Sequence, residues 1–191
     1  VICIAVSVIC GIIAVKYFWK AFPEASIEFQ VDRSGSREIA QSFLTGRGYP
    51  VDDYMHAAVF DYDDETKVFL ERTLTPEEVT KLLSTDVKLW KWSHRWFKPL
   101  QKEELRVDVT PAGEISRFSH LIPEEAEGAN LDGPNAQTIA LNYLNQVQGI
   151  DTGTLELLYS EEEKRPNRTD HIFTWKRKGF DIHDADYRIR V

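Results

Sequence analysis

A short pattern occurs twice in this chain, one hundred residues apart, and this repeat limits the possible folds more than any other feature. Residues 36–44 (SREIAQSFL) and 135–144 (NAQTIALNYL) share the core Ile-Ala-x-x-Phe/Tyr-Leu. Both have apolar residues at the spacing of one helix face, a residue of N-cap type at the start (Ser36 or Asn135), and glycine after the end. Each copy therefore predicts one amphipathic helix.

Strand-like stretches follow both predicted helices in the same order. They are residues 56–60, 87–92 and 105–109 after the first helix, and residues 155–159, 171–175 and 187–191 after the second. The last stretch of each set (LRVDV and YRIRV) alternates apolar and polar residues, as a half-buried strand does. The first copy continues through a turn, TPAGE, into another strand, whereas the second stops at Val191. The sequence predicts an α+β fold with two tandem helix-plus-antiparallel-sheet modules, the second truncated.

The first fifteen residues (VICIAVSVICGIIAV) carry no charge. As a helix they would span roughly 22 Å, less than the ~30 Å core of a bilayer, and because the chain does not begin with Met the missing turns are expected upstream. Lys16, Lys20 and the three aromatic residues between them are typical of a membrane interface. A cleaved signal peptide and a buried helix are the alternatives. We predict an uncleaved transmembrane anchor, with residues 1–20 in the lipid bilayer.

Two further segments complete the predicted organisation. Thr75, Pro76 and Glu78 have the order of a cap residue, a first-position proline and an acid at the third position, which predicts a short additional helix. The acidic stretch before the second copy contains several Gly and Pro residues and predicts a connector. We therefore predict four parts: a truncated anchor (1–22), a first module (23–123), a linker (124–134) and a second, truncated module (135–191).

Charge separates the apolar head from the rest of the chain. Of the 23 basic and 31 acidic residues, residues 1–20 hold two lysines and no acid, so the remainder has a net charge of −10. Such an acidic body excludes nucleic acid as the partner, because phosphate binding needs a basic face. Cys3 and Cys10 both lie in the head, so the body has no cysteine for a disulfide or a zinc site. An acidic body after a head with few basic residues favours an extracytoplasmic position, in a single-pass membrane protein.

Two aromatic regions are candidate binding surfaces. In residues 90–98 (WKWSHRWFK), alternation puts Trp90 and Trp92 on one strand face, which is either a recognition surface or a face packed under a helix. In the second region Asp170 precedes His171 beside an aromatic strand, where a carboxylate could orient an imidazole, and a structural histidine is the alternative. The candidate binding residues are Trp90, Trp92, Trp96, Asp170, His171 and Trp175.

Acidic and histidine patterns do not predict a metal or catalytic site. Residues 61–65 (DYDDE) begin like a calcium loop, but Thr66 and Arg72 occupy the positions that need Gly and Glu, so a solvated hairpin tip is predicted. The five histidines show no i, i+4 pair of the helical zinc type, and residues 183–186 predict a turn. The body also has no Ser-x-x-Lys, Gly-x-Ser-x-Gly or cysteine nucleophile. We predict no catalytic, cofactor-binding or metal-binding residue in this chain.

Three motifs carry a family resemblance. Residues 106–115 (RVDVTPAGEI) resemble the last hairpin of PepSY-like modules of bacterial envelope proteins, of the PepSY/cystatin-like type. The layout of an apolar helix ending in YFWKAFP (17–23), then a body with RPNRTDHIFTW (165–175), resembles the region ahead of the catalytic helices in bacterial CPBP (CAAX-protease-like) intramembrane metalloproteases. The resemblance implies that the zinc and the catalytic motifs belong to later helices of a parent protein, and so implies no catalytic residue here.

We therefore expect a non-catalytic extracytoplasmic accessory or sensor domain of a larger bacterial membrane protein, a CPBP-type intramembrane metalloprotease, with a membrane-domain or protein partner. The alternative is a membrane-tethered ligand- or protein-binding module with no protease attached. A third hypothesis, an anchored hydrolase, depends on Asp170 and His171.

Overall fold

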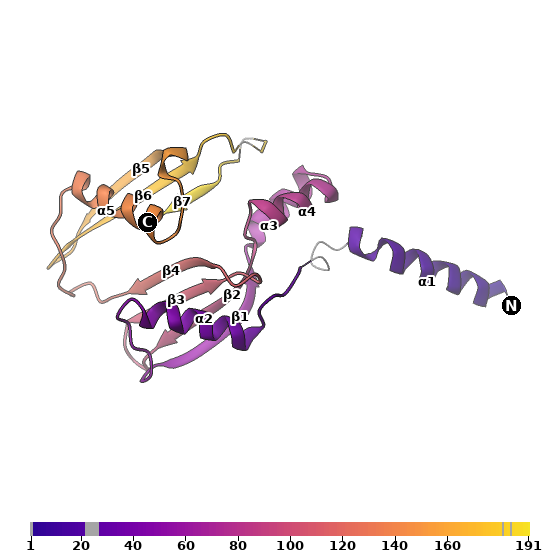
Figure 1. Ribbon diagram of the computed structural model, residues 1–191, viewed down its shortest axis with the longest axis horizontal. Helices are drawn as coiled ribbons and strands as arrows, with labels where there is room; N and C mark the ends of the chain where they lie inside the picture. The colour runs from indigo at the N-terminus through magenta and orange to yellow at the C-terminus, as the bar shows by residue number, and fades with distance from the viewer. Residues whose placement is uncertain (1, 22–26, 181, 184) are drawn as a thin grey trace. The chain divides into compact units, whose positions relative to one another are not determined.

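The computed structural model describes residues 2–21, 27–180, 182–183 and 185–191. It is an α+β chain that divides into two compact units, Val1–Leu121 and Ile122–Val191, each with its own antiparallel sheet (Figure 1). The predicted module boundary at residues 22 and 23, and Asp184 in the predicted turn, lie outside the described residues.

The first helix, α1 (Ile2–Ala21), does not confirm the predicted membrane anchor. Among the helices of the described residues, none is both long enough and apolar enough to cross a bilayer. The apolar run of α1 stops at Lys16, so residues 2–15 extend over about 21 Å, against ~30 Å for the hydrocarbon core. The prediction of a transmembrane helix, and with it the single-pass membrane localisation, is wrong, and the extracytoplasmic position that depended on it has no support.

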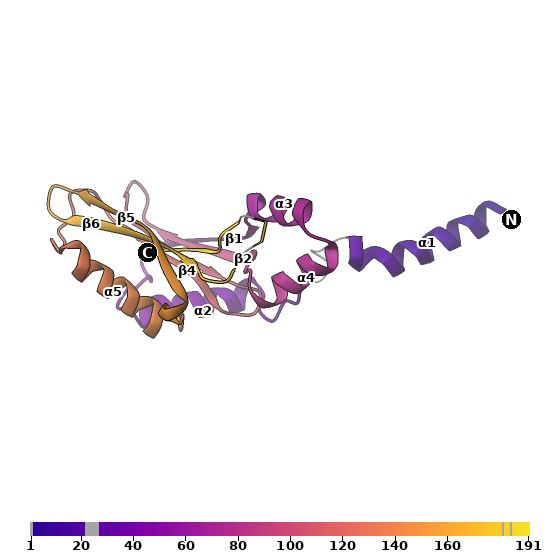
Figure 2. The same cartoon turned by 90° about the horizontal axis from the view of Figure 1, so that it is seen from above.

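The first unit is a meander of four strands with a helix across one face. Strands β1 (Met55–Tyr62), β2 (Trp90–Phe97), β3 (Glu104–Val109) and β4 (Ile115–Leu121) pair in the order β1-β2-β3-β4. Helix α2 (Arg33–Thr45) lies along the sheet (Figure 2). The buried core between them consists of Ala40, Leu44, Val51, Trp96, Leu105, Val107 and Val109. The helix face predicted from the repeat is therefore the face that packs on the sheet.

The helix begins one turn earlier than the repeat indicated. Its N-cap is Asp32, whose carboxylate accepts a hydrogen bond from the Gly35 backbone N–H at 2.8 Å. Ser36, the predicted cap, instead lies within the helix and is fully buried. The second copy behaves in the same way, because Asp132 caps its helix through the Asn135 N–H at 2.9 Å.

An insertion of two helices separates β1 from β2. Helix α3 (Asp64–Thr73) is capped by Asp63, whose carboxylate accepts from the Thr66 N–H at 2.8 Å. The acidic stretch 61–65 is therefore a strand end and a helix start, and the prediction of a hairpin tip is wrong. Helix α4 (Pro76–Thr85) has the capping box that its sequence predicts.

The second unit has the same order of elements without the insertion. Helix α5 (Gly133–Gln146) is followed by a single 3₁₀ turn (Thr152–Thr154) and by β5 (Leu155–Lys164), β6 (Thr169–Arg177) and β7 (Arg188–Arg190), paired in the order β5-β6-β7. Its core consists of Ala136, Ala140, Leu144, Leu155, Phe173 and Trp175. Ala140 and Leu144 occupy the places that Ala40 and Leu44 have in the first unit.

The acidic connector is held by one buried arginine. Arg168, 8% exposed, donates from Nη1 to the backbone carbonyls of Pro123, Glu124 and Ala126 at 2.9, 3.2 and 2.9 Å. A Cβ on Gly128 would come within 2.9 Å of the Arg168 side chain, so the close approach needs glycine. The first part of the predicted linker is thus bound to the second unit.

Candidate functional site

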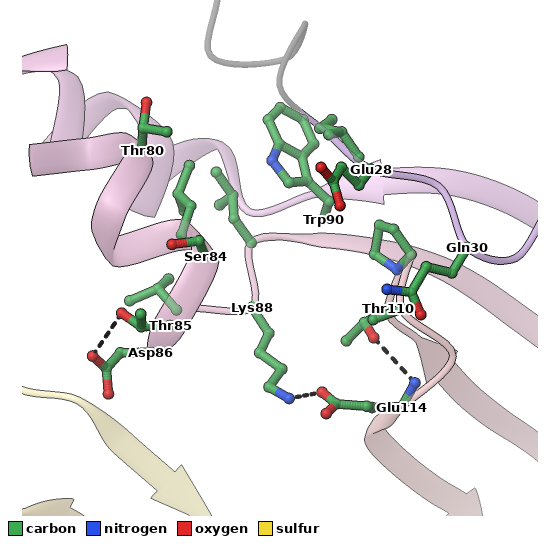
Figure 3. Close-up of a pocket in the computed structure, with 16 residues that line it drawn as sticks. Glu28, Gln30, Thr80, Ser84, Thr85, Asp86, Lys88, Trp90, Thr110 and Glu114 are labelled. Carbon is green, nitrogen blue, oxygen red and sulfur yellow. Dashed lines mark hydrogen bonds and ion pairs between the residues drawn. The ribbon is translucent and has the colours of Figure 1, made fainter. Parts of the chain in front are cut away.

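The first unit has a hollow of about 610 Å³ at the end of its sheet (Figure 3). Helix α4 forms one side with Thr80, Ser84 and Thr85, and the β3–β4 turn with Glu114 forms the other. Residues 87–90 form the floor between them. The floor and walls combine apolar side chains with hydroxyl and charged groups, as ligand-binding clefts do.

The hollow exists because β2 extends further than its neighbour β3 at this end of the sheet. The first residue of β2, Trp90, pairs with Tyr62 of β1, but β3 ends at Val109, which pairs with Trp92. The chain then turns tightly, with the Thr110 N–H donating to the Glu114 carbonyl at 2.8 Å and Gly113 at φ +89°. The start of β2 therefore projects beyond the β3–β4 hairpin and leaves a notch beside it.

Charged groups border this notch. Lys88 on the floor forms an ion pair with Glu114 of the turn, and burial lowers the pKa of the Lys88 ammonium (Figure 3). Glu28 and Asp86 also belong to the lining, and the Asp86 carboxylate accepts from the Thr85 hydroxyl at 3.0 Å. Among the lining residues that the structure describes, three are carboxylates and one is an ammonium.

The three candidate tryptophans of the first unit have different surroundings. Trp90 lies in the floor of the hollow, with its ring centroid 5.0 Å from that of Tyr62. The Trp92 indole donates to the Val31 carbonyl at 3.3 Å, and its ring contacts Phe60 at 4.9 Å between centroids. Trp96 is 1% exposed in the core. One member of the predicted surface therefore lines the hollow, and another is a core residue.

The other three candidates, Asp170, His171 and Trp175, lie in the second unit. The Asp170 carboxylate accepts from Arg168 at 2.7 Å and from Arg165 at 3.0 Å, and the Arg168 hydrogen bond holds its pKa below the usual range. His171 Nε2 lies 2.9 Å from the Leu131 carbonyl, and Trp175 is 2% exposed. Asp170 is committed to two arginines, so the predicted acid–imidazole pair of the hydrolase hypothesis is not formed.

Sequence analysis missed a buried polar group under α2. His56 Nε2 lies 3.0 Å from His94 Nδ1, and His94 Nε2 lies 3.1 Å from Ser36 Oγ. Burial first, and then His56, Arg33 and Arg37, lower the pKa of His94 to about 4. The Ser-His-His order resembles that of a nucleophile and its base, but Ser36 is 0% exposed, so no substrate can reach its hydroxyl. No sequence spacing could have found this group, because its members come from a helix and two strands.

In the part of the chain that the structure describes, no three His, Cys, Asp or Glu side chains are placed to hold a metal ion. Searches of family models, curated proteins and solved structures find no match to this chain. These searches give no support to the PepSY and CPBP resemblance or to a role in proteolysis. The membrane character that accompanies this resemblance is unsupported as well, because no helix of the described residues can span a bilayer. The predicted partners, a lipid bilayer through residues 1–20 and a protein but no nucleic acid, stay predictions.

Proposed function

We propose that this chain is a non-catalytic binding module that holds an extended, basic segment of a protein partner in the hollow of its first unit. The observation that carries the proposal is the hollow itself, whose volume of about 610 Å³ is within the ~300–1,000 Å³ range of ligand sites. Attachment to a larger protein as an accessory or sensor domain fits a binding role, and attachment to a CPBP protease stays a prediction.

An extended peptide fits because the notch lies at a strand edge. Among the described strands, none pairs with the β3-facing side of the first two residues of β2, Trp90 and Lys91. A peptide strand placed there would continue the line of β3, and its backbone would pair with this side of β2. The half-buried Leu83 and Val87 of the lining would supply apolar contact beside it.

A basic segment fits because of the charges around the notch. Glu28, Asp86 and Glu114 outnumber Lys88. Helix α4 also points its C-terminal carbonyls, the negative end of its dipole, toward this site, and its last turn contains no basic residue of its own. A Lys or Arg side chain of the partner would therefore find a favourable field.

Peptide selection with a filled-groove variant tests the proposal. Peptides selected from a random displayed library on the whole chain are expected to be rich in Lys and Arg. In fluorescence polarisation they should bind at least about tenfold more weakly to Ala112→Trp, because the indole would occupy the notch.

The matched control is Ala57→Trp, which places the same exposed side chain on β1, on the sheet face away from α2. Its affinity for the selected peptides should equal that of the unchanged chain. Failure to select any peptide, or equal loss of affinity in both variants, would contradict the proposal.

A further inference from the structure

A buried chain of hydrogen bonds joins α2 to the first sheet. Starting at β1, it runs from His56 Nε2 to His94 Nδ1 (3.0 Å) and from His94 Nε2 to Ser36 Oγ (3.1 Å). It ends where the Ser36 hydroxyl meets the Arg33 carbonyl in the first turn of α2 (3.1 Å). His94 is 1% exposed and Ser36 is 0% exposed, so water does not replace these contacts.

The acceptor at the end of this chain fixes every proton in it. The Arg33 carbonyl can only accept, so the Ser36 hydroxyl donates its one proton to it and accepts from His94 Nε2–H. The Nδ1 atom of His94 then has a lone pair, and it accepts from His56 Nε2–H. The geometry assigns His94 to the neutral Nε2–H form and places a proton on His56 Nε2.

A further proton on His94 would disturb this order. A proton on His94 Nδ1 would point at the His56 Nε2–H at 3.0 Å, so His56 would have to carry its own proton on Nδ1 instead, and a positive ring would remain at a site that is 1% exposed. The charged groups that bear on the two rings are Arg33 and Arg37 of α2, and both oppose a positive imidazole. The neighbouring strands place Ala58 and Val107 beside His94, and these side chains offer no compensating charge.

We propose that the His56–His94–Ser36 chain is an acid-sensitive latch, which holds α2 on the first sheet near neutral pH and releases it when His94 takes up a proton. When α2 is released, His94 is exposed to water. Water then accepts the hydrogen bonds of the protonated ring, so protonation leaves no donor without a partner. The second unit lacks this latch, because Ala136, in place of Ser36, lies at the corresponding point of α5.

The direction of the effect follows from the two states of His94. Its pKa is about 4 in the folded chain and near its ordinary value of 6.5 once α2 has opened, so the open state binds the proton more tightly. Closure of α2 is therefore fully stable above about pH 6.5 and weakens as the pH falls toward 4. Between pH 7 and pH 4.5 the opening equilibrium should rise roughly 50-fold.

Native-state hydrogen exchange of the whole chain measures this opening. The amide protection factors of Ala40 and Leu44 in α2, corrected for the intrinsic pH dependence of exchange, are expected to fall about 50-fold from pH 7 to pH 4.5. Those of Ala140 and Leu144 in α5 should remain nearly constant. An equal fall in both helices would overturn the latch, because it would report general acid unfolding.

Two variants separate the histidine chain from other acid effects. In the double variant His56→Gln with His94→Gln, α2 should lose the specific response to pH, whereas the control His171→Gln in the second unit should keep it. A specific response that persists in the double variant would refute the proposal. Should the double variant not fold, the ring ¹⁵N shifts of His94 in the unchanged chain decide: a neutral Nε2–H ring at pH 6 is expected, and a charged ring there refutes the latch.

Discussion

At the scale of single residues, Arg168 shows how one buried cation organises a stretch of chain that has no secondary structure. Its guanidinium donates to three connector carbonyls and to the Asp170 carboxylate, so these four groups have a hydrogen-bond partner. Asp170 in turn supplies the compensating charge. Removal of Asp170 would leave the buried Arg168 without its counter-charge, whereas removal of Arg168 would leave the partly exposed Asp170 paired with Arg165.

Arg168→Ala is expected to lower the free energy of unfolding of the second unit by about 3 kcal/mol, since three buried carbonyls lose their donor and Asp170 loses one of its two arginines. Urea unfolding followed by circular dichroism measures the loss. Arg165→Ala is the matched control, because Arg165 binds the same Asp170 while the three connector carbonyls are bound by Arg168, and it should cost less. An equal cost for both variants would show that the connector contacts contribute nothing.

At the scale of elements, the sequence predicted the helices of the repeat, the order of the strands and the capping box of α4, because each depends on a local pattern of polarity or capping. The caps of α2 and α5 were misplaced by one turn, since Asp32 and Ser36 are both good cap residues and only the contact between Ser36 and His94 distinguishes them. Helix α3 was missed because its acidic start resembles a surface loop. The hollow was also missed, because it depends on where β3 stops relative to β2.

The two caps offer a matched test of element stability. Asp32→Ala and Asp132→Ala should each lower the free energy of unfolding of their own unit by about 1 kcal/mol, because each removes one acceptor for an N-terminal N–H. Hydrogen exchange at the first turn of α2 and of α5 assigns each loss to its helix. A loss of protection in α2 from Asp132→Ala, or the reverse, would contradict independent capping.

At the scale of the whole molecule, one plan occurs twice and only one copy carries an insertion. Helices α3 and α4 fit between β1 and β2 of the first unit, and α4 forms one wall of the hollow. The second unit passes from β5 to β6 through a short connection, and so has no counterpart of that wall. Binding in this chain is thus expected to be a property of one unit.

Excision of the insertion tests this expectation. Tyr62 and Trp90 face each other in the β1–β2 pair, so a two-residue Asn-Gly turn can replace residues 63–89 and close the hairpin. The shortened chain should keep its strand signal in circular dichroism and bind the selected peptides at least about tenfold more weakly. Undiminished affinity in a folded variant would place the binding site elsewhere.

An insertion confined to one copy has an evolutionary consequence. Where only one copy of a repeated segment gains a new wall, natural selection acts on the two copies for different reasons. On the proposed function, the first copy is constrained around Trp90, Lys88 and Glu114 by the peptide in the hollow. The second is constrained mainly by its own folding, through residues such as Ala140 and Leu144. Among relatives of this chain, the second copy is therefore expected to accumulate substitutions faster at its exposed strand positions.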